Sequence, residues 1–422
     1  MPRWSAPSQH TALPTPGAGA ALADTGPRRV GAVADGIDSV RREARRILEE
    51  AWDDYRGYSF PHAQVYAHLW LWDSCFHAIA WSAFGDLRAV RELEAVFAAQ
   101  LPSGFVPHMR YASPSMARGP LTHASGYTQP PVYGHALATI ARDGLPVPRP
   151  LVAHVEAAFE YLWTRRRASH GLLEIYHPWE AGADDSPRWD GWIGSTEWER
   201  PRWTAFDLQA LQETEFAESG EAVANRAFTA APAAFNAIAA HGMRELATVT
   251  GDENWQRRAT TLATAIDDVL WNPAEALWSD LAVNGPSTSV AVPTLDGVVP
   301  ALATADPGRA AAALGQLDDA ARFAAPYGLA YVARGHELYR GDLYWRGAAW
   351  PQMNHLARVA AVRWGRHDLA DAIAEMTRRG AAASGFSELW DPATGRAGGA
   401  VPQTWAALAA VTRIDQPPAI TE

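Results

Sequence analysis

Cysteine is almost absent from the sequence: Cys75 is the only one in 422 residues. A single thiol excludes an internal disulfide framework and is typical of a reducing compartment, so we expect a cytoplasmic protein. Long hydrophobic runs are also missing. Residues 1–30 hold no uninterrupted apolar core of signal-peptide length, and no later run approaches the length that crosses a membrane. We therefore expect no membrane partner.

Basic clusters and metal motifs are absent as well. The chain has 36 lysines and arginines against 47 aspartates and glutamates, which gives a formal net charge of −11. This balance argues against nucleic acid or an anionic membrane as a partner. The 14 histidines show no HExxH or comparable ligand spacing, and no glycine-rich phosphate loop is present. The sequence thus predicts no metal and no cofactor, and it leaves the oligomeric state open.

What the sequence does have is tryptophan, with 19 residues, many of them beside proline, glycine or charged residues. The densest example is YHPWEAGADDSPRWDGW at 176–192. Prolines and glycines interrupt this segment, so we expect a loop, and loops on a rigid scaffold often carry binding and catalytic residues. A simpler interpretation is that Asp185 or Ser186 starts the next helix. The neighbouring carboxylates and indoles suggest aromatic walls around a polar ligand.

The spacing of apolar residues is helical over most of the chain. Asp35, Asp252 and Asp306 are expected N-caps. Strand signals are short, the best being GLLEIY at 171–176, and βαβ alternation is missing. We therefore expect an all-α chain of helix pairs closed into a ring. The expected helices cover roughly 37–51, 70–84, 87–97, 129–143, 151–167, 204–218, 222–248, 255–269, 350–363, 367–379 and 402–413.

Four other segments combine acids, amides or histidine with aromatic and turn residues. A sugar needs this mixture, because its hydroxyls require donors and acceptors while its C–H face packs well on an indole. Cleaving a glycosidic bond needs in addition a carboxylic acid that protonates the leaving oxygen and a carboxylate that activates water or attacks the anomeric carbon. The segments are YAHLWLWDSCFH (66–77), SGFVPHMRY (103–111) with SGYTQPPVYGHA (125–136), YWRGAAWPQMNH (344–355) and FSELWDPATGRAGGAVPQTW (386–405).

Five ordered motifs resemble glycoside hydrolase family 63, in particular its bacterial mannosylglycerate and glucosylglycerate hydrolase branch. They are WLWDSCFH, SGFVPHMRY, HPWEAGADDSPRWD, YWRGAAWP and FSELWDPATG, spread over roughly residues 60–410. The resemblance implies an (α/α)6 barrel, a six-hairpin toroid with short β-hairpins in its loops. It also implies an inverting mechanism on α-linked sugars, a small carbohydrate substrate and no metal. We expect one catalytic domain at 31–416 after a flexible tail at 1–30.

The resemblance also implies roles for individual residues. By motif position, Asp184 corresponds to the general acid and Glu388 to the general base. Asp73 would hold sugar hydroxyls in subsite −1, and Gln403 follows Glu388 at the family's spacing. An inverting pair of carboxyls is roughly 6.5–9.5 Å apart, because a water must fit between base and anomeric carbon. The other positions implied to bind substrate are Tyr66, Trp70, Trp72, His108, Gln129, Trp179, Gly182, Tyr344, Trp345 and Trp350.

The chain departs from the family pattern in two places. The family core is usually ESGxDNSP, whereas this chain has EAGADDSP, with Asp185 in place of the asparagine. A carboxylate beside Asp184 would raise its pKa by like-charge repulsion, which suits an acid, but Asp185 is also a rival for that role. The branch binds glycerate through an Arg and a Tyr after the acid motif, and STEWERPRW at 195–203 offers only Arg200 or Arg202. We therefore expect an altered leaving-group subsite.

Other interpretations remain open at this point. A sugar epimerase or polysaccharide lyase can use an α/α barrel, although it would need histidine or tyrosine as proton carrier where these motifs offer carboxylates. A non-catalytic carbohydrate-binding protein is a further alternative, which the presence of both Asp184 and Glu388 disfavours. Asp73 could instead be a helix N-cap, single tryptophans could belong to the core, and Arg346 is expected to pair with a carboxylate. The sequence does not distinguish glucose from mannose.

Overall fold

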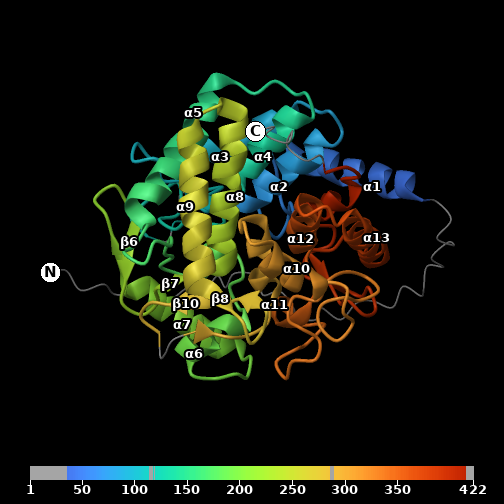
Figure 1. Ribbon diagram of the computed structural model, residues 1–422. Coiled ribbons are helices and arrows are strands. Elements are labelled where there is room, and N and C mark those ends of the chain that lie inside the picture. Colours follow the sequence, from blue (N-terminus) through green and yellow to red (C-terminus); the bar gives the residue numbers. More distant parts are fainter. Residues whose placement is uncertain (1–35, 114–116, 118, 286–288, 415–422) are drawn as a thin grey trace.

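Helices are the main regular element of the fold (Figure 1). The computed structural model describes residues 36–113, 117, 119–285 and 289–414. The expected tail and the expected N-cap Asp35 lie outside these residues. Within them, no helix combines the length and the apolar character needed to cross a membrane. The α-helices are α1 (Ile37–Ala51), α2 (Leu71–Ser82), α3 (Arg88–Phe97), α4 (Tyr133–Arg142), α5 (Arg149–Tyr161), α6 (Asp190–Ile193), α7 (Arg200–Gln212), α8 (Ala233–Thr250), α9 (Glu253–Leu270), α10 (Pro307–Gly315), α11 (Tyr344–Gly347), α12 (Pro351–Arg363) and α13 (His367–Ser384).

Strands are short and lie in the helix connections. β7, β10 and β11 form a three-stranded antiparallel sheet, and the others form antiparallel pairs of neighbours along the chain. The expectation of a helical chain with short strands in its connections is confirmed, whereas β3 with β4 and β7 with β10 pair across intervening helices and are not hairpins. The strands are β1 (Trp52–Asp53), β2 (Tyr58–Ser59), β3 (Leu69–Trp70), β4 (Met109–Arg110), β5 (Thr214–Phe216), β6 (Ala222–Asn225), β7 (Ala230–Ala231), β8 (Trp271–Asn272), β9 (Leu277–Trp278), β10 (Asp280–Ala282), β11 (Ser289–Val290), β12 (Leu389–Trp390) and β13 (Ala397–Gly398).

Two of the expected N-caps are confirmed. The side chain of Asp252 accepts a hydrogen bond from the backbone N–H of Asn254 at 2.8 Å, at the start of α9. Asp306 accepts from the backbone N–H groups of Gly308 and Arg309 at 2.8 and 3.1 Å, at the start of α10. Each carboxylate satisfies donors that have no partner inside the first turn of a helix.

Four expected elements differ from the structure. The expected helix at 204–218 is wrong in its last part, because α7 ends at Gln212 and β5 follows it. The expected helix at 222–248 is wrong in its first part, which forms β6 and β7. The helix α8 begins only at Ala233. Its N-cap residue, Pro232, has an extended backbone conformation. The segment at 402–413 is mostly a 3-10 helix, η7 (Thr404–Ala410). GLLEIY at 171–176 is no regular strand, since it pairs only through isolated bridges.

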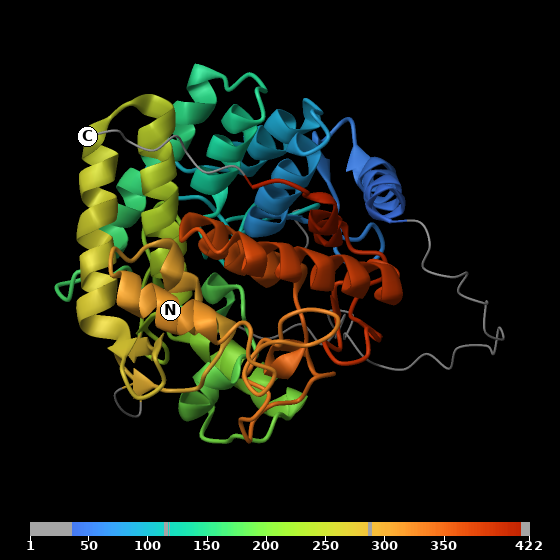
Figure 2. The same cartoon turned by 45° about the vertical axis from the view of Figure 1, so that its right-hand side comes forward.

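Six elements contact one another in a closed cycle. α2 packs on α4, α4 on α8, α8 on the 3-10 helix η6 (Val299–Leu302), η6 on α12, α12 on η7, and η7 on α2. Each of them has a neighbour outside the cycle: α3 on α2, α5 on α4, α9 on α8, α10 on η6, α13 on α12 and α1 on η7. The α8–α9 pair lies side by side in both views (yellow in Figures 1 and 2). The cycle encloses the core.

Two of the inner helices are buried on almost all sides. Every residue of α2 is buried, and so are residues 351–362 of α12. The outer helix α1 instead buries one face, formed by Ala44, Ile47 and Leu48. Polar side chains of the inner helices, such as those on α2, therefore lie inside the molecule and need partners there.

Helices α4 and α8 approach most closely through glycine. A Cβ on Gly134 would lie 2.6 Å from the carbonyl oxygen of Gly242 and 2.8 Å from Cε2 of Phe159. Real Cβ atoms do not tolerate such distances, so this contact of the ring requires a residue without a side chain. Gly315, at the end of α10, is the opposite case, because a Cβ there meets no atom within 4 Å.

We expect Gly134→Ala to lower the free energy of unfolding by roughly 1–3 kcal/mol, because the new methyl group overpacks the α4–α8 contact. Gly315→Ala is the matched control and should leave it unchanged or raise it by up to about 1 kcal/mol. Urea denaturation followed by circular dichroism measures both. Equal midpoints for the two variants would show that α4 and α8 can separate without cost.

Candidate active site

The loop that carries Asp184 consists of two 3-10 turns, η3 (Pro178–Ala181) and η4 (Pro187–Trp189). Between them, Gly182 has a φ of 73°, in the left-handed region where a side chain is strained. A Cβ on Gly182 would also lie 2.7 Å from Cη2 of Trp72. The loop backbone therefore lies directly on the Trp72 indole, which comes from a different motif of the sequence.

A buried ion pair holds this loop in place. Glu180 is fully buried, and its carboxylate accepts hydrogen bonds from Nη1 and Nη2 of Arg166 at 3.1 and 2.8 Å. The same carboxylate accepts from the backbone N–H groups of Tyr176 and Thr128 at 2.6 and 3.0 Å. Hydrogen bonds to charged groups are the strong ones, and here they fix the start of the loop. The sequence analysis did not single out either charged residue, because a glutamate in a turn and an arginine in a helix are ordinary.

Asp184 lies half-buried in a group of carboxyls. Burial, followed by the negative charges of Asp185, Asp207 and Glu388, raises its pKa well above the usual value of an aspartate. Asp207 comes from α7 and was not predicted. Its Oδ1 is buried without a hydrogen-bond partner among the described residues, and burial together with the charge of Asp185 raises its pKa to about 8. These surroundings favour the protonated form of Asp184 over the ionised one.

Asp185 has different neighbours. Nε1 of Trp198 donates to its Oδ2 at 3.1 Å. Burial raises the pKa of Asp185, while this hydrogen bond and the charges of Arg200 and Arg346 lower it. Arg346 is itself paired with Asp190 through distances of 2.7 and 2.6 Å, which confirms that it binds a carboxylate. The two adjacent carboxyls of the loop thus face different environments.

Glu388 lies in the segment that follows α13 and is 3% exposed. The backbone N–H of Ala400 donates to its Oε2 at 2.9 Å, and the hydroxyl of Tyr66 lies 3.2 Å from both oxygens. Burial raises the pKa of Glu388 to about 7, and these two donors lower it. They stabilise the ionised carboxylate, so Glu388 is the carboxyl of the pair that loses its proton first.

Asp73 occupies the first turn of α2. The N-cap of this helix is Trp70, so the alternative that Asp73 is itself the N-cap is wrong. Asp73 accepts from Nε2 of Gln403 at 3.3 Å, and burial followed by the charge of Glu388 raises its pKa to about 8. The indole nitrogen of Trp405 donates to the carbonyl of Glu388 at 2.9 Å, and its backbone N–H donates to Oε1 of Gln403 at 2.7 Å. The predicted site residues Asp73, Gln403 and Glu388 are therefore linked by hydrogen bonds that involve Gln403 and Trp405.

Two of the predicted tryptophans form a buried slab. The rings of Trp345 and Trp350 stack with centroids 3.8 Å apart and planes at 6°. They are 1% and 0% exposed, so both tryptophans belong to the core and do not form an exposed wall of a pocket. Tyr344 is half-buried and packs edge-on against Trp350 at 5.0 Å. Burial, followed by the charges of Asp184 and Glu388, raises the pKa of its hydroxyl, which places Tyr344 near both carboxyls.

A second aromatic group surrounds His108. The ring centroids of Trp70 and Trp179 lie 5.5 and 6.1 Å from that of His108. Burial lowers the pKa of His108 to about 4, so its imidazole is neutral. Oε1 of Gln129 accepts from the backbone N–H of Trp72 at 3.3 Å, which connects this group to the acid loop through the indole beneath Gly182.

The predicted site residues differ in how far they are exposed to solvent. Asp184 is half-buried, whereas Glu388 and Asp73 are 3% and 5% exposed. Asp184 is therefore the most exposed of these three carboxyls. The other half-buried members are Tyr66, Trp70, Trp179 and Tyr344, and the buried ones are Trp72, His108, Gln129, Gly182, Trp345, Trp350 and Gln403.

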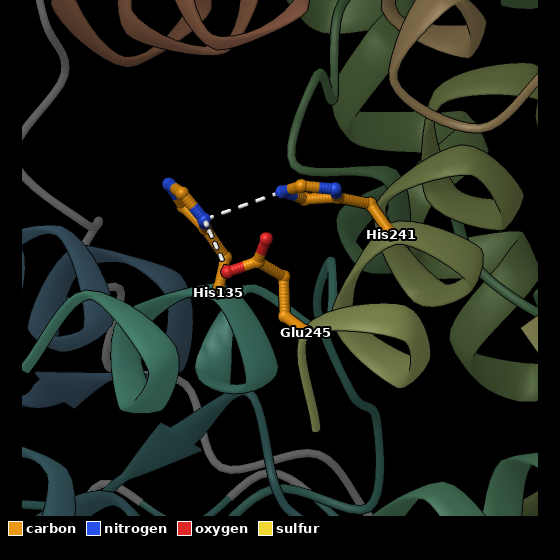
Figure 3. Close-up of side chains that lie close together, drawn as sticks. All are labelled: His135, His241 and Glu245. Carbon is orange, nitrogen blue, oxygen red and sulfur yellow. Dashed lines mark hydrogen bonds and ion pairs between the residues drawn. The ribbon is translucent and has the colours of Figure 1, made fainter. Parts of the chain in front are cut away.

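A separate group of titratable side chains lies between inner helices (Figure 3). Nδ1 of His135 is 3.2 Å from Nε2 of His241 and 4.0 Å from the Oε2 of Glu245. Nε2 of His135 is 3.4 Å from Nε2 of His355. The ligand atoms of His135, His241 and Glu245 lie within 4.8 Å of one another, as in metal sites. Arg142 donates to the same Oε2, so a guanidinium supplies the positive charge beside Glu245. Sequence spacing missed this group because it joins separate helices.

Known proteins resemble this chain in sequence. The family model described as Mannosylglycerate hydrolase MGH1-like glycoside hydrolase domain matches residues 66–406. The mannosylglycerate hydrolase of Rubrobacter radiotolerans is 28% identical over 431 residues, which cover 88% of this chain and 96% of that protein. The glucosylglycerate hydrolase of Mycolicibacterium hassiacum is 25% identical over 422 residues, which cover 82% of this chain and 91% of that protein.

The fold is also found among solved structures. The GH63 mannosylglycerate hydrolase of Thermus thermophilus, in complex with Tris and D-glycerate, matches with a TM-score of 0.74 and 23% identity, covering 88% of this chain and 99% of that one. The same enzyme in complex with glucose gives a TM-score of 0.72 and 22% identity over 88% of this chain and 99% of that one. At this level of identity the likeness concerns the fold.

Proposed function

We propose that this chain, which belongs to the family of mannosylglycerate hydrolase MGH1-like glycoside hydrolases, cleaves a small α-glucoside or α-mannoside with inversion. Asp184 is the general acid and Glu388 the general base. One contrast carries this assignment: other carboxyls around Asp184 favour its protonated form, whereas two donors favour the ionised form of Glu388. Environments that separate two carboxyls in this way divide the acid and base roles between them.

In the proposed reaction, the protonated carboxyl of Asp184 donates its proton to the leaving-group oxygen as the glycosidic bond breaks. A water gives one proton to the carboxylate of Glu388, and the water oxygen forms the new bond to the anomeric carbon. Exchange with solvent then returns a proton to Asp184 and removes one from Glu388. Inversion requires the two carboxyls roughly 6.5–9.5 Å apart, and this separation stays a prediction.

The sugar that is cleaved lies against Asp73. Its carboxyl accepts hydrogen bonds from sugar hydroxyls, and Gln403 holds it in place. Tyr66 and Tyr344, whose hydroxyls lie near the carboxyls, flank the bond that breaks. The half-buried indole of Trp179 covers one face of the ligand, since an indole can stack on sugar C–H groups and exclude water.

The framework that we propose for this site is an (α/α)6 barrel. The closed cycle of six inner elements, each with an outer helix, supports this architecture. Residues 31–416 then act as one catalytic domain. The cytoplasmic location and the absence of a nucleic-acid partner stay predictions, because they rest on composition alone.

The leaving-group side is proposed to differ from a glycerate site. Arg202 is paired with Glu199 at 2.8 Å on the surface. Arg200 lies close enough to Asp185 and Asp207 for its charge to lower the pKa of both. Both arginines after the acid motif, which lie in the first turn of α7, therefore already face carboxylates. A neutral leaving group, such as a polyol, suits this environment better than an anionic one.

Replacing either proposed catalytic carboxyl should lower kcat by about 10²–10⁴-fold while the Tm stays close to that of the unchanged protein. Asp184→Asn should regain activity on an α-glycosyl fluoride, whose leaving group needs little protonation, and Glu388→Gln should not. Asp185→Asn is the matched control and should keep most of its activity. A severe loss in Asp185→Asn together with an active Asp184→Asn would assign the acid role to Asp185.

The pH dependence of kcat/KM should have an acidic limb near pH 7, because Glu388 must be ionised to accept a proton and its pKa is about 7. Tyr66→Phe removes a donor that lowers this pKa, so the limb should move to higher pH. The shape of the profile measures this shift independently of any loss in binding. An unmoved limb in Tyr66→Phe would mean that another group than Glu388 sets it.

A matched pair of substrates tests the leaving group. Glucosylglycerol and glucosylglycerate differ by a hydroxymethyl group in place of a carboxylate, as do the two mannosides. We expect the neutral member of each pair to have a kcat/KM at least about 10-fold higher, because the loop carries carboxylates beside its arginines. Preferential hydrolysis of a glycosylglycerate, lost in Arg200→Met but not in Arg202→Met, would overturn this view of the subsite.

A further inference from the structure

Two turns of α2 are held by two consecutive residues from the far end of the sequence. Asp73 and His77 are four residues apart on the helix, so their side chains lie on one face. Asp73 accepts from Nε2 of Gln403 at 3.3 Å, and Nε2 of His77 lies 2.6 Å from the hydroxyl of Thr404. All four residues are buried. This double contact fixes the start of η7 against the helix.

The surroundings of Thr404 define the direction of its hydrogen bonds. Its hydroxyl oxygen lies 3.1 and 3.2 Å from the carbonyl oxygens of Phe60 and Pro61, which can only accept. The single hydroxyl proton therefore goes to these carbonyls, and the hydroxyl oxygen accepts from Nε2–H of His77. Nδ1 of His77 carries no proton in this tautomer. It lies 3.7 Å from Oε1 of Glu92 and has no hydrogen-bond partner among the described residues.

Burial disfavours the charged forms of the groups packed around His77. Burial lowers the pKa of His77 to about 3. Burial raises the pKa of Glu92 to about 8, although hydrogen bonds from Ser59 lower it. Burial also raises the pKa of the Cys75 thiol, two residues before His77 on the same helix. His77 therefore acts as a fixed, neutral donor beneath Asp73.

We propose that His77 is a positioning residue for the sugar-binding end of the pocket, which fixes the Gln403 amide on the carboxylate of Asp73 by holding Thr404. The inference rests on the proposed role of Asp73. With one oxygen held by Gln403, the carboxylate keeps a single orientation, and its remaining acceptor capacity is available to sugar hydroxyls. No atom of His77 touches the sugar.

The same segment also reaches the proposed base. Trp405 donates from its backbone to Gln403 at 2.7 Å and from its indole to the carbonyl of Glu388 at 2.9 Å. A shift of Thr404 is therefore transmitted to both ends of the reacting sugar. Distances of a few tenths of an ångström matter here, because catalysis requires the reacting groups to be held in place.

The test uses His77→Leu, which removes the donor, and His77→Gln, whose amide can donate from a similar position. We expect His77→Leu to lower kcat/KM by about 10-fold or more and His77→Gln to restore most of it. Thr404→Val should reproduce the loss without altering the histidine, and Thr404→Ser should retain activity. His241→Leu, a buried histidine on α8, controls for general destabilisation and should lower the Tm with kcat/KM unchanged.

A double-mutant cycle with Gln403→Leu separates positioning from stability. If His77 acts through Gln403, the double variant should be within about 3-fold of Gln403→Leu alone, because the contact that His77 supports is already lost. Multiplied losses, or full activity in both His77→Leu and Thr404→Val, would overturn the inference while leaving the role of Asp73 intact. Unchanged kcat/KM in Gln403→Leu and Asp73→Asn would instead overturn both the proposed sugar-binding role of Asp73 and the inference on His77.

Discussion

The arrangement of the site depends on the buried ion pair between Glu180 and Arg166. Charges are expensive to remove from water, and a buried pair is tolerated only when its remaining hydrogen-bonding capacity is also filled. Two backbone N–H groups fill the capacity of the Glu180 carboxylate here, one of them from Thr128, whereas Nε of Arg166 has no partner among the described residues. The pair therefore ties the segment after α5, the segment before α4 and the acid loop to one point. From that point the loop runs over Trp72 and presents Asp184 among the other carboxyls.

Sequence reasoning worked best for the outer layer of the fold. Helices such as α1 and α9 bury one face, and their apolar residues recur with the helical period, so both were predictable together with the N-cap Asp252. It failed where an element is buried all round. The inner helix α8 shows no polar face that would mark its beginning, and the prediction at 222–248 extended it through β6 and past Pro232. The local sequence does not show whether a strand-like segment finds a pairing partner elsewhere in the chain. GLLEIY was therefore predicted as a strand, although it pairs only through isolated bridges.

The segments that form the candidate site were predictable, but the exposure and packing of their side chains were not. Acids, indoles and turn residues in ordered motifs indicated which segments meet. The stacking of Trp345 on Trp350 depends on the packing of the ring and is invisible in a local pattern, so their burial could not be foreseen. Asp207 comes from a helix of ordinary composition. Its place beside Asp184 results from the tertiary fold alone.

The closed cycle of helices has a consequence for how the protein is made. Tyr66 meets Glu388 across 322 residues, His77 meets Thr404 across 327, and Asp73 meets Gln403 across 330. Such long-range contacts form late and slowly, because a long stretch of chain must be ordered before they can close. A nascent chain on the ribosome therefore presents an open arc of helices with apolar inner faces, and it needs protection from aggregation until its last segment emerges. Catalytic competence arrives in one step, with the residues that complete the ring.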